Sequence, residues 1–419
     1  MTNKQLNKSQ IFLVTGPMNI KVISGTVSVI GAEFGKGKTF SVPQGKKVPV
    51  ETIPASGEVK LQSSGKGRIE QLEKRTIPAM WDSLAQKIYK EKLKKILILG
   101  EVDTGKSFFT TYISNKLINN GSTVGILDCD VGQSDVGPPG TLGLAICKKK
   151  FLFLANQPAD DIYFIGSLSP GLHLTLFLTG IDKLTTEASA KTDFLIIDTT
   201  GWVHGDGGRQ VKHSKIDIIN PDLVILLQRK DELEHLVLTV PPKKVFRLEV
   251  SKTASNTSQH DRKLLREMVS IDYFKGSKKF AIPLTKLKTE RSYFKSGNEV
   301  NIPNKKVVYA ERLRAWEGTL VFVKEALTPA EAGELSKSFG NIRQFKTGQE
   351  KYITIALLDG NRKTLGLGSI EKIDFKSGKL HFHSPLPEKL IKKVCIIQFG
   401  SNRTDFSGRE MGFISPGAI

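Results

Sequence analysis

The stretch KKILILGEVDTGKS, residues 94–107, decides the fold of this chain. It begins with the apolar run 96–99, which predicts a buried strand. Residues 100–107 then fit G-x-x-x-x-G-K-[ST] at every position, and FFTTYISNKLINNG, which follows, has apolar residues at helical spacing. Strand, glycine-rich loop and helix in this order are typical of a phosphate-binding P-loop.

Such a loop would hold the phosphates of a nucleoside triphosphate. Its backbone N–H groups and the N-terminus of the helix point at the phosphates. The lysine is placed to reach the β- and γ-phosphate oxygens, and the serine after it to bind Mg²⁺. The predicted nucleotide-binding residues are Gly100, Glu101, Val102, Asp103, Thr104, Gly105, Lys106 and Ser107.

A second stretch, AEFGKGKT at residues 32–39, also ends in G-K-T. Alanine stands where the first glycine of the motif belongs, and FSVPQG, which follows, reads as a strand and a turn. A phosphate would face no helix N-terminus there. We therefore expect a basic hairpin loop rather than a nucleotide site.

The composition indicates a globular protein of two or three domains, since 39% of the 419 residues are hydrophobic. No apolar run approaches the roughly 20 residues that span a bilayer. The first ten residues lack the apolar core of a signal peptide. Cys129, Cys147 and Cys395 lie far apart, which argues against a disulfide framework or a zinc site. We expect a cytoplasmic protein without a membrane partner.

A formal net charge of +20 points to a polyanionic partner. Residues 243–296 carry 14 Lys and Arg against 5 Asp and Glu. This concentration lies close in sequence to the predicted nucleotide site and favours nucleic acid. A basic, solvated surface without such a partner is the alternative.

Three regions, with a linking helix between the first two, follow one another along the chain. Residues 1–76 predict an all-β domain and residues 77–93 one amphipathic helix. Residues 94–300 alternate between strands and helices, and residues 301–419 return to short strands. The expected fold class is α/β: a central P-loop NTPase domain with a mostly parallel sheet, between an N-terminal β-domain and a small, strand-rich C-terminal domain. Central strands are expected at 96–99, 123–128, 151–154, 193–197, 223–227 and 244–248, and a helix at 261–273.

Acidic side chains follow two of the predicted strands. Asp128 and Asp130 come at the end of one, close to Gln133, and Asp198 ends another apolar run. The carboxyl ends of parallel strands lie on the ligand side of such a sheet. Asp128 and Asp130 could therefore act on the terminal phosphate, and Asp198 could hold Mg²⁺. Turn residues that cap the next helix are the alternative for the first two.

Two further features near this site have both a binding and a structural interpretation. Trp202 lies between two glycines soon after Asp198, so it could stack on a base or pack in the core. Arg262 and Arg266 lie four residues apart on the predicted helix 261–273. They could form a lid that stabilises charge on a transferring phosphoryl group, or a solvated basic face.

Taken together, these motifs resemble those of the polynucleotide 5′-hydroxyl kinases of RNA processing. The resemblance is to the archaeal polyribonucleotide 5′-hydroxyl kinases above all, and also to the kinase subunit of eukaryotic pre-mRNA cleavage factor. Its main segments are GEVDTGKS at 100–107, LDCDVGQSDVGPPGT at 127–141, FIGSLSP at 164–170, DTTGWVHG at 198–205 and RKLLREMVSIDYFKG at 262–276. GTVSVIGAEF at 25–34 and LGLGSIEKID at 365–374 extend it over nearly the whole chain.

The resemblance implies a role for each candidate residue. The catalytic and metal-binding roles would fall to Lys106 on the phosphates, Asp130 as the base that takes the 5′-hydroxyl proton, Arg262 and Arg266 as the lid, and Ser107 and Asp198 on Mg²⁺. The substrate-binding roles would fall to Gln133, Ser167, Ser169 and Trp202.

The resemblance implies transfer of the γ-phosphate of ATP to the 5′-hydroxyl end of RNA, with DNA as a second candidate acceptor. It also implies RNA-processing proteins as partners. Two alternatives stay open. One is a non-catalytic, ATP-binding scaffold subunit of an RNA-processing complex. The other is a P-loop ATPase or small-metabolite kinase whose basic surface is incidental.

The charge distribution predicts that salt weakens the binding of nucleic acid. Each phosphate neutralised on a single strand should contribute a slope of about −0.7 to log K against log salt concentration. Titration of a labelled oligonucleotide at increasing NaCl should show this steep loss, while the affinity for ATP falls less. A flat oligonucleotide affinity would contradict the prediction.

Overall fold

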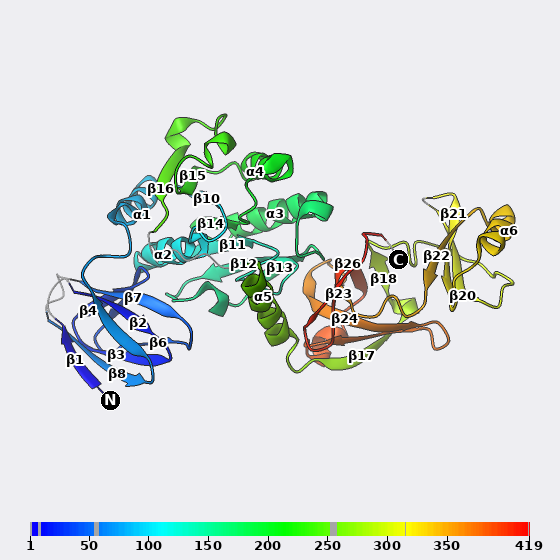
Figure 1. Cartoon of the computed structure of the whole chain (residues 1–419), viewed down its shortest axis with the longest axis horizontal. Coiled ribbons are helices and arrows are strands. Elements are labelled where there is room, and N and C mark those ends of the chain that lie inside the picture. The colour runs from blue at the N-terminus through cyan, green and yellow to red at the C-terminus, as the bar shows by residue number, and fades with distance from the viewer. Residues whose placement is uncertain (1, 7–9, 54–57, 252–257, 315, 418) are drawn as a thin grey trace.

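The computed structural model describes residues 2–6, 10–53, 58–251, 258–314, 316–417 and 419. Figure 1 shows an elongated molecule with strand-rich parts towards both ends and a mixed part of helices and strands between them. None of the described helices has the length and apolar composition needed to cross a membrane.

The described residues before the first helix form two antiparallel sheets, with strand orders β1-β8-β3-β6 and β5-β4-β7-β2-β9. Buried and exposed residues alternate along β3, as expected of a strand with one face on a core. The strands are β1 (Thr2–Leu6), β2 (Ile11–Thr15), β3 (Met18–Ser24), β4 (Thr26–Val29), β5 (Ala32–Gly35), β6 (Thr39–Val42), β7 (Lys47–Thr52), β8 (Val59–Gly65) and β9 (Arg68–Leu72).

The second G-K-T stretch lies between β5 and β6, and a strand follows it rather than a helix. The predicted strand after this stretch is confirmed, but the predicted hairpin is wrong. β5 and β6 belong to different sheets, so the loop links the two sheets. The sequence pattern showed a turn between two strands and carried no information about which strands they pair with.

A seven-stranded sheet of order β13-β12-β11-β14-β10-β15-β16 forms the middle of the molecule. The neighbouring strands β11, β14, β10, β15 and β16 run parallel to one another. β12 is antiparallel to both of its neighbours, β11 and β13. The strands are β10 (Lys95–Gly100), β11 (Val124–Cys129), β12 (Thr141–Cys147), β13 (Asp161–Phe164), β14 (Phe194–Thr199), β15 (Leu223–Gln228) and β16 (Val245–Glu249).

Helices cover both faces of this sheet. Ile96 and Ile98 of β10 enter the core that contains α2 and the N-terminal sheets, and Leu97 and Leu99 enter the core that contains α3 and α4. Burial on both faces explains the unbroken apolar run of this strand. The helices are α1 (Ala79–Glu91), α2 (Lys106–Asn119), α3 (Leu174–Ser189), α4 (Gly205–Ile219) and α5 (Gln259–Phe274), with 3₁₀ turns η2 (Leu154–Asn156), η3 (Gly171–His173), η4 (Glu234–Leu236), η5 (Pro242–Lys244) and η6 (Leu284–Lys286).

The strand expected at 151–154 is wrong. The antiparallel strands β12 and β13 occupy this edge of the sheet, and η2 begins at Leu154. Phe151 and Leu154 are both buried in the core next to α2. The short apolar run therefore reflects core contacts of a loop, which periodicity alone cannot distinguish from a buried strand.

The N-terminal part is fastened to α2, the helix that follows the P-loop. Asn115 Nδ2 donates to Ile30 O (2.9 Å), and Asn119 Nδ2 donates to Gly31 O (2.8 Å). Gly31 has φ +76°, and a Cβ atom there would lie 2.6 Å from Tyr112 O. Only glycine permits this approach, so the turn between β4 and β5 lies directly against α2.

The described residues after α5 form two further sheets, β17-β25-β24-β23-β26-β18 with β27 on β26, and β19-β20-β21-β22. Their elements are β17 (Lys278–Pro283), β18 (Lys288–Glu290), β19 (Gly297–Glu299), β20 (Val307–Leu313), β21 (Gly318–Val323), α6 (Pro329–Phe339), β22 (Asn341–Lys346), β23 (Ile353–Leu358), β24 (Thr364–Asp374), β25 (Lys379–Ser384), α7 (Glu388–Ile391), β26 (Ile396–Thr404) and β27 (Glu410–Phe413).

β17 and β18 fall within the segment 94–300 but pair with the C-terminal strands β25 and β26. This pairing favours a boundary just after α5 over one at residue 300. The division of the chain into domains stays a prediction.

Candidate active site

The P-loop lies at the carboxyl end of β10, between that strand and α2 (Figure 1). Because β10 is flanked by β14 and β15, the loop lies over the middle of the sheet. Thr104 Oγ1 donates a hydrogen bond to Glu101 O (2.9 Å) across the loop. Gly105 has φ +86° directly before α2 begins at Lys106. This left-handed conformation accounts for the glycine that the motif requires here.

Lys106 reaches back over the loop. Its Nζ donates to Glu101 O (2.6 Å), and its side chain is buried. Burial lowers the pKa of Lys106, while nearby carboxylates, with Asp198 the strongest, oppose this shift. A buried cation among carboxylates, beneath a loop of N–H donors, is suited to bind phosphate oxygens.

The structure brings together the two residues predicted to bind a metal. Ser107 Oγ donates to Asp198 Oδ2 (2.8 Å), and Asp198 Oδ1 accepts from Thr199 N (2.8 Å). Asp198 is buried, and burial raises its pKa to about 6 against the opposing effects of Lys106 and Ser107. A hydroxyl and a carboxylate oxygen thus lie side by side at the start of α2.

Asp128 organises the loop that follows β11. Its Oδ2 accepts from Asp135 N (2.6 Å) and Val136 N (3.0 Å), and its Oδ1 accepts from Asp130 N (2.9 Å). Burial raises the pKa of Asp128 well above its ordinary value. For this residue the structure supports the turn-forming alternative over direct chemistry on a phosphate.

Asp130 and Gln133 come from the same loop and contact different partners. Asp130 Oδ1 accepts from Gly132 N (3.1 Å) and Gln133 N (3.0 Å), which fixes the orientation of its carboxylate. Gln133 Nε2 donates to Arg262 O (3.0 Å) at the beginning of α5. The loop after β11 therefore presents an acid and also supports the helix that carries both predicted lid arginines.

A cavity of about 480 Å³ contains these groups. It is bounded by the P-loop, the loop after β11, the end of β14 and α5. Ten of the site residues predicted from the sequence line it: Val102, Asp103, Gly105, Lys106, Ser107, Asp130, Gln133, Asp198, Arg262 and Arg266.

Sequence reasoning missed several of the residues that line this cavity. Asp135 is the second acid of the loop after β11; burial raises its pKa, and a hydrogen bond with Ser107 opposes this rise. Lys46 comes from the loop between β6 and β7 of the N-terminal part, and Leu265, Met268 and Val269 come from α5. The acid could have been found from the motif D-V-G-Q-S-D, whereas the others depend on contacts between remote segments.

Both predicted lid arginines already bind carboxylates. Arg262 Nη2 lies 2.9 Å from Asp103 Oδ2 in the P-loop. Arg266 donates from Nε to Glu410 Oε1 (2.5 Å) and from Nη2 to Glu410 Oε2 (3.2 Å). These pairs join α5 to the P-loop at one point and to β27 at another.

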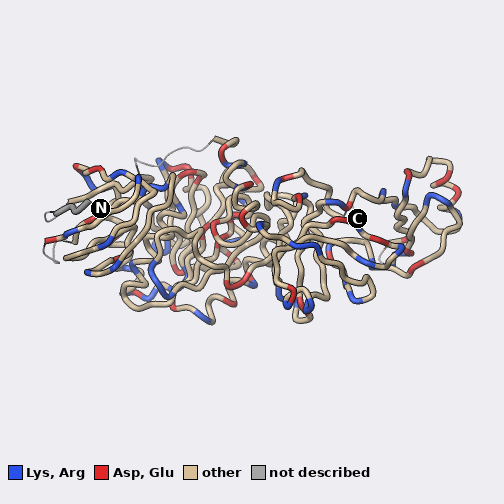
Figure 2. The backbone as a smooth tube through the Cα atoms, turned by 90° about the horizontal axis from the view of Figure 1, so that it is seen from below, with Lys and Arg blue, Asp and Glu red and all other residues tan. Residues whose placement is uncertain are grey.

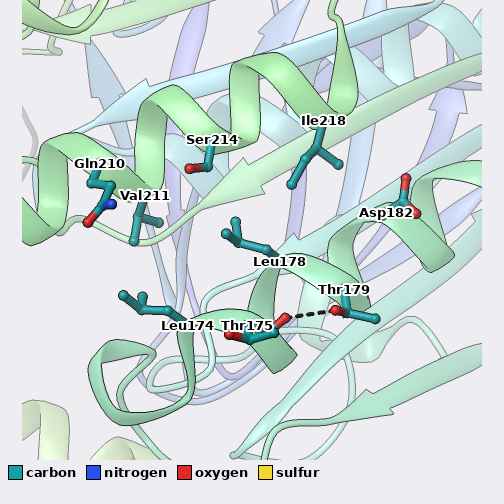
Figure 3. A pocket seen from close by; sticks show the side chains of 9 residues that line it. All are labelled: Leu174, Thr175, Leu178, Thr179, Asp182, Gln210, Val211, Ser214 and Ile218. Carbon is teal, nitrogen blue, oxygen red and sulfur yellow. Dashed lines mark hydrogen bonds between the residues drawn. The ribbon is translucent and has the colours of Figure 1, made fainter.

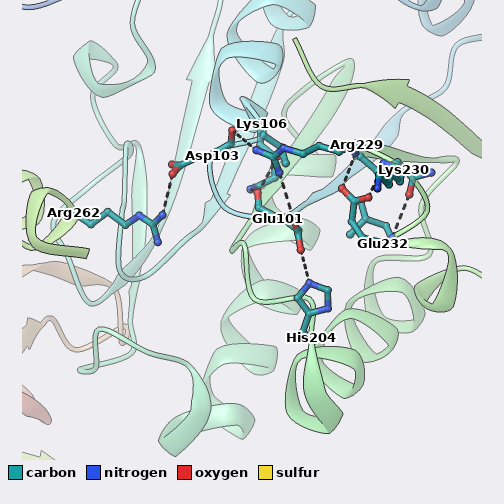
Figure 4. A network of polar contacts seen from close by, with 11 residues as sticks. Glu101, Asp103, Lys106, His204, Arg229, Lys230, Glu232 and Arg262 are labelled. Atoms are coloured by element: carbon teal, nitrogen blue, oxygen red, sulfur yellow. Dashed lines mark hydrogen bonds and ion pairs between the residues drawn. The ribbon is translucent and has the colours of Figure 1, made fainter. Parts of the chain in front are cut away.

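Basic side chains from other segments also hold the P-loop, as Figure 4 shows. Glu101 accepts from His204 Nε2 and lies 3.4 Å from Arg229 Nη1. Arg229 Nη2 also donates to Asp103 O (3.4 Å). The sequence offers no signal for these contacts, because each partner lies more than a hundred residues from the loop.

Three of the predicted substrate-binding residues lie outside the described lining of the cavity. Trp202 is partly buried against the core next to α3 and α4, and a Cβ atom at Gly207 would lie 2.6 Å from its ring. Ser167 Oγ donates to Ser169 O (2.8 Å), so these two serines form a local turn. Their roles on a substrate stay predictions.

The turn after β14 rests on a buried lysine of α4. Lys212 Nζ donates to Thr200 O (2.6 Å) and Thr199 Oγ1 (3.0 Å). Burial lowers its pKa well below the ordinary value. Lys212 thereby fixes the backbone that runs from Asp198 to the cavity wall at Gly201.

A second cavity, of about 420 Å³, lies between α3 and α4 (Figure 3). Its lining mixes Leu, Ile and Val with hydroxyl groups, and Thr179 Oγ1 donates to Thr175 O (2.8 Å) within it. The described residues that line it include Asp182 but no basic side chain. Its described lining therefore offers no positive charge to a phosphate.

Similarity to known proteins covers most of the chain. Residues 100–276 match the family described as the mRNA cleavage and polyadenylation factor CLP1 P-loop. The polyribonucleotide 5′-hydroxyl-kinase of Methanocaldococcus jannaschii is 30% identical over 78% of this chain and 92% of its own length. That of Pyrococcus abyssi is 31% identical over the same shares.

The fold is similar to that of Clp1p in a complex with Pcf11p. The TM-score is 0.64 at 14% identity, and the alignment covers 96% of this chain and 97% of that one. At this identity the likeness concerns the fold.

The buried carboxyl of Asp198 predicts a pH-dependent effect of Asp198→Asn on stability. The folded pKa of about 6 lies above the ordinary value of 3.8, so ionisation destabilises the folded protein as pH rises between these values. The free energy of unfolding of the variant minus that of the wild type should therefore increase by up to about 3 kcal/mol between pH 4 and pH 7. Urea titrations over this range measure it, and a difference that stays constant with pH would disprove it.

Proposed function

The chain belongs to the family of polyribonucleotide 5′-hydroxyl kinases, and we propose that it transfers the γ-phosphate of ATP to the 5′-hydroxyl end of RNA. One observation carries the proposal: a single cavity holds Lys106 and Ser107 of the P-loop together with the oriented carboxylate of Asp130. The names of the archaeal relatives support the same reaction.

Asp130 is the proposed general base. Its carboxylate lines the cavity and is held by two backbone N–H groups, so it can receive the 5′-hydroxyl proton from a fixed direction. Proton removal increases the negative charge of the attacking oxygen and contributes about 10²- to 10⁴-fold to such a step. Asp128 is less suited to this role, because both of its oxygens accept backbone hydrogen bonds and it does not belong to the described lining of the cavity.

Positive charge for the transferring phosphoryl group would come from both walls of the cavity. Lys106 provides it from the P-loop, and Arg262 and Arg266 provide it from α5. Asp103 and Glu410 hold the two guanidinium groups at the cavity and partly neutralise them. Such preorganised cations stabilise the charge on the phosphoryl oxygens in the transition state.

Ser107 and Asp198 would hold Mg²⁺. Their oxygens lie 2.8 Å apart beside Lys106, and Mg²⁺ is commonly bound by one or two carboxylates together with phosphate oxygens and water. In the part of the chain that the structure describes, no group of three or more His, Cys, Asp or Glu could hold a metal ion. When bound, the ion would neutralise negative charge on the phosphates.

The acceptor is proposed to be RNA, with DNA as the second candidate. Figure 2 shows Lys and Arg along the whole length of the molecule, interspersed with Asp and Glu. The basic segment 243–296 is itself divided among β16, α5, β17 and β18. This distribution supports contacts along an extended polyanion more than one compact patch.

Further parts of the proposal concern organisation and partners. We assign the N-terminal β-sheets and the C-terminal strand-rich part to separate domains around the central one, in a cytoplasmic protein. Clp1p forms a complex with Pcf11p, and we propose RNA-processing proteins as partners of this chain too.

The two rival functions are a non-catalytic ATP-binding scaffold and a P-loop ATPase or small-metabolite kinase. Asp130 and Lys106 in one cavity favour catalysis over a scaffold, since ATP binding alone would not require an oriented acid. The net charge of +20 favours a polyanionic acceptor over a small metabolite.

Lys106→Ala should abolish phosphoryl transfer. Without the buried ammonium group, transfer of labelled phosphate from ATP to a 5′-hydroxyl oligoribonucleotide should fall at least about 10³-fold. Lys90→Ala, at an exposed position of α1, is the matched control and should keep wild-type activity. RNA and DNA acceptors tested side by side identify the preferred substrate. If wild type and Lys106→Ala show the same background level of phosphate transfer, the kinase proposal fails and the result favours the scaffold function.

Asp130→Asn should keep ATP binding and lose most of the transfer. The amide cannot accept the hydroxyl proton, so kcat should fall about 10²- to 10⁴-fold. ATP affinity, measured by calorimetry, should stay close to that of the wild type. A near-normal kcat would remove the base role from this residue.

Trp202→Ala separates base stacking from core packing. Stacking predicts a higher KM for the oligonucleotide or a lower kcat, with ATP affinity unchanged. Core packing predicts a lower melting temperature together with loss of both affinities. The contacts of Trp202 with Gly207 and Gly208 make the melting measurement the decisive one.

A further inference from the structure

α5 exposes an unusual number of apolar side chains. Among the described residues of this helix, five large apolar side chains are between 37% and 65% exposed: Leu264, Leu265, Met268, Val269 and Ile271. Single exposed apolar residues are common on protein surfaces. Contiguous ones on one helix indicate a binding surface.

These five side chains fall into two sets. Leu265, Met268 and Val269 line the same cavity as Lys106, and we call them the apolar wall. Leu264 and Ile271 are equally apolar and exposed but lie outside the described lining of that cavity. The apolar wall therefore faces the phosphate-binding groups across open space, while the second set provides a built-in comparison on the same helix.

Contacts at both ends of α5 bring the apolar wall close to the loops that carry the proposed base and the predicted substrate-binding serines. At the first turn, Arg262 O accepts from Gln133 Nε2, next to the proposed base Asp130. Further along, Ser270 lines a small cavity together with Pro139, from the loop after β11, and Leu168, which lies between the predicted substrate-binding residues Ser167 and Ser169. The apolar wall lies between these two points. Lys46, in contrast, enters the cavity from the loop between β6 and β7 of the N-terminal part.

The ligand that fits such a cavity is charged at one end and flat and apolar at the other. Phosphate groups fit the P-loop and the lysine, whereas an aliphatic wall contributes dispersion contacts and excludes water. The 5′-terminal nucleotide of the acceptor has its hydroxyl one sugar ring away from its base, so a hydroxyl near Asp130 brings the base close to α5.

Resting on the proposed kinase function, we propose that the apolar wall of Leu265, Met268 and Val269 receives the 5′-terminal nucleobase of the acceptor strand. The faces of all four bases are apolar, and an aliphatic surface offers no hydrogen-bonding group to distinguish them. The contact therefore positions the 5′-hydroxyl without selecting sequence. This apolar wall is independent of Trp202, which packs on the glycines of α4.

The test compares Met268→Ala with Leu264→Ala. Both changes shorten an exposed apolar side chain of the same helix and keep helix propensity high, but only Met268 lines the cavity. Met268→Ala should raise KM for a 5′-hydroxyl oligoribonucleotide about four- to fifteenfold, the equivalent of one or two buried methylene groups. Leu264→Ala should leave KM unchanged, and both variants should keep the wild-type KM for ATP and melting temperature.

An acceptor whose 5′-terminal nucleotide lacks its base provides a second, independent measurement. On this acceptor the difference between wild type and Met268→Ala should disappear, because the contact that the side chain makes is already missing. A purely structural role of Met268 would leave the difference in place.

The outcomes separate the inference from the function on which it rests. If the wild type phosphorylates RNA but Met268→Ala and Leu264→Ala behave alike, the apolar wall does not contact the acceptor base. A raised KM for ATP alone would assign this wall to the adenine of the donor and overturn the proposal. If the wild type transfers no phosphate at all, the kinase function itself fails.

Discussion

Burial of charged groups beneath the phosphate loop is the constraint on which the rest of the site depends. Lys106, Asp128, Asp198 and Lys212 are all buried at the carboxyl edge of the central sheet. A buried charge is costly unless it is paired and hydrogen-bonded, so each of these groups needs partners at fixed positions. The P-loop carbonyls, the N–H groups after β11 and the hydroxyl at the end of β14 supply them. The shapes of the three loops around the cavity follow from these requirements.

The sequence could predict what is local, because a motif fixes the conformation of its own segment. The strand–loop–helix around Lys106 and the acid at the end of β14 lie where their patterns indicated, and the helix expected at 261–273 is α5. Partners that arrive from remote segments left no pattern. Glu410 binds Arg266 from 144 residues away, and no spacing rule relates the two. The wrong prediction of a strand at 151–154 has the same cause. The apolar residues of this loop pack into a core that forms between distant parts of the chain.

Two kinds of surface meet in the cavity, and each suits a different half of a nucleotide. The P-loop, Asp130 and Asp198 form a polar floor of charges and N–H donors, while Leu265 and Val269 form an apolar side. Phosphates and sugar hydroxyls are recognised by directional hydrogen bonds, whereas bases are held through their faces. With the phosphate groups on the polar floor and a base on the apolar side, recognition of the chemical end of a strand would not require recognition of its sequence.

The attachment of α2 to the N-terminal turn at Gly31 has a mechanical consequence. One side of the cavity is held by a continuous hydrophobic core and by the amides of Asn115 and Asn119, which would have to be exposed to water for it to move. The opposite side, α5, meets the P-loop through the part-buried ion pair of Arg262 with Asp103, whose guanidinium a bound anion could also engage. The side of the cavity formed by α2 is therefore the more rigid one. A displacement of α5 would therefore widen the cavity without separating α2 from the N-terminal sheets, and the P-loop at the start of α2 would keep its shape.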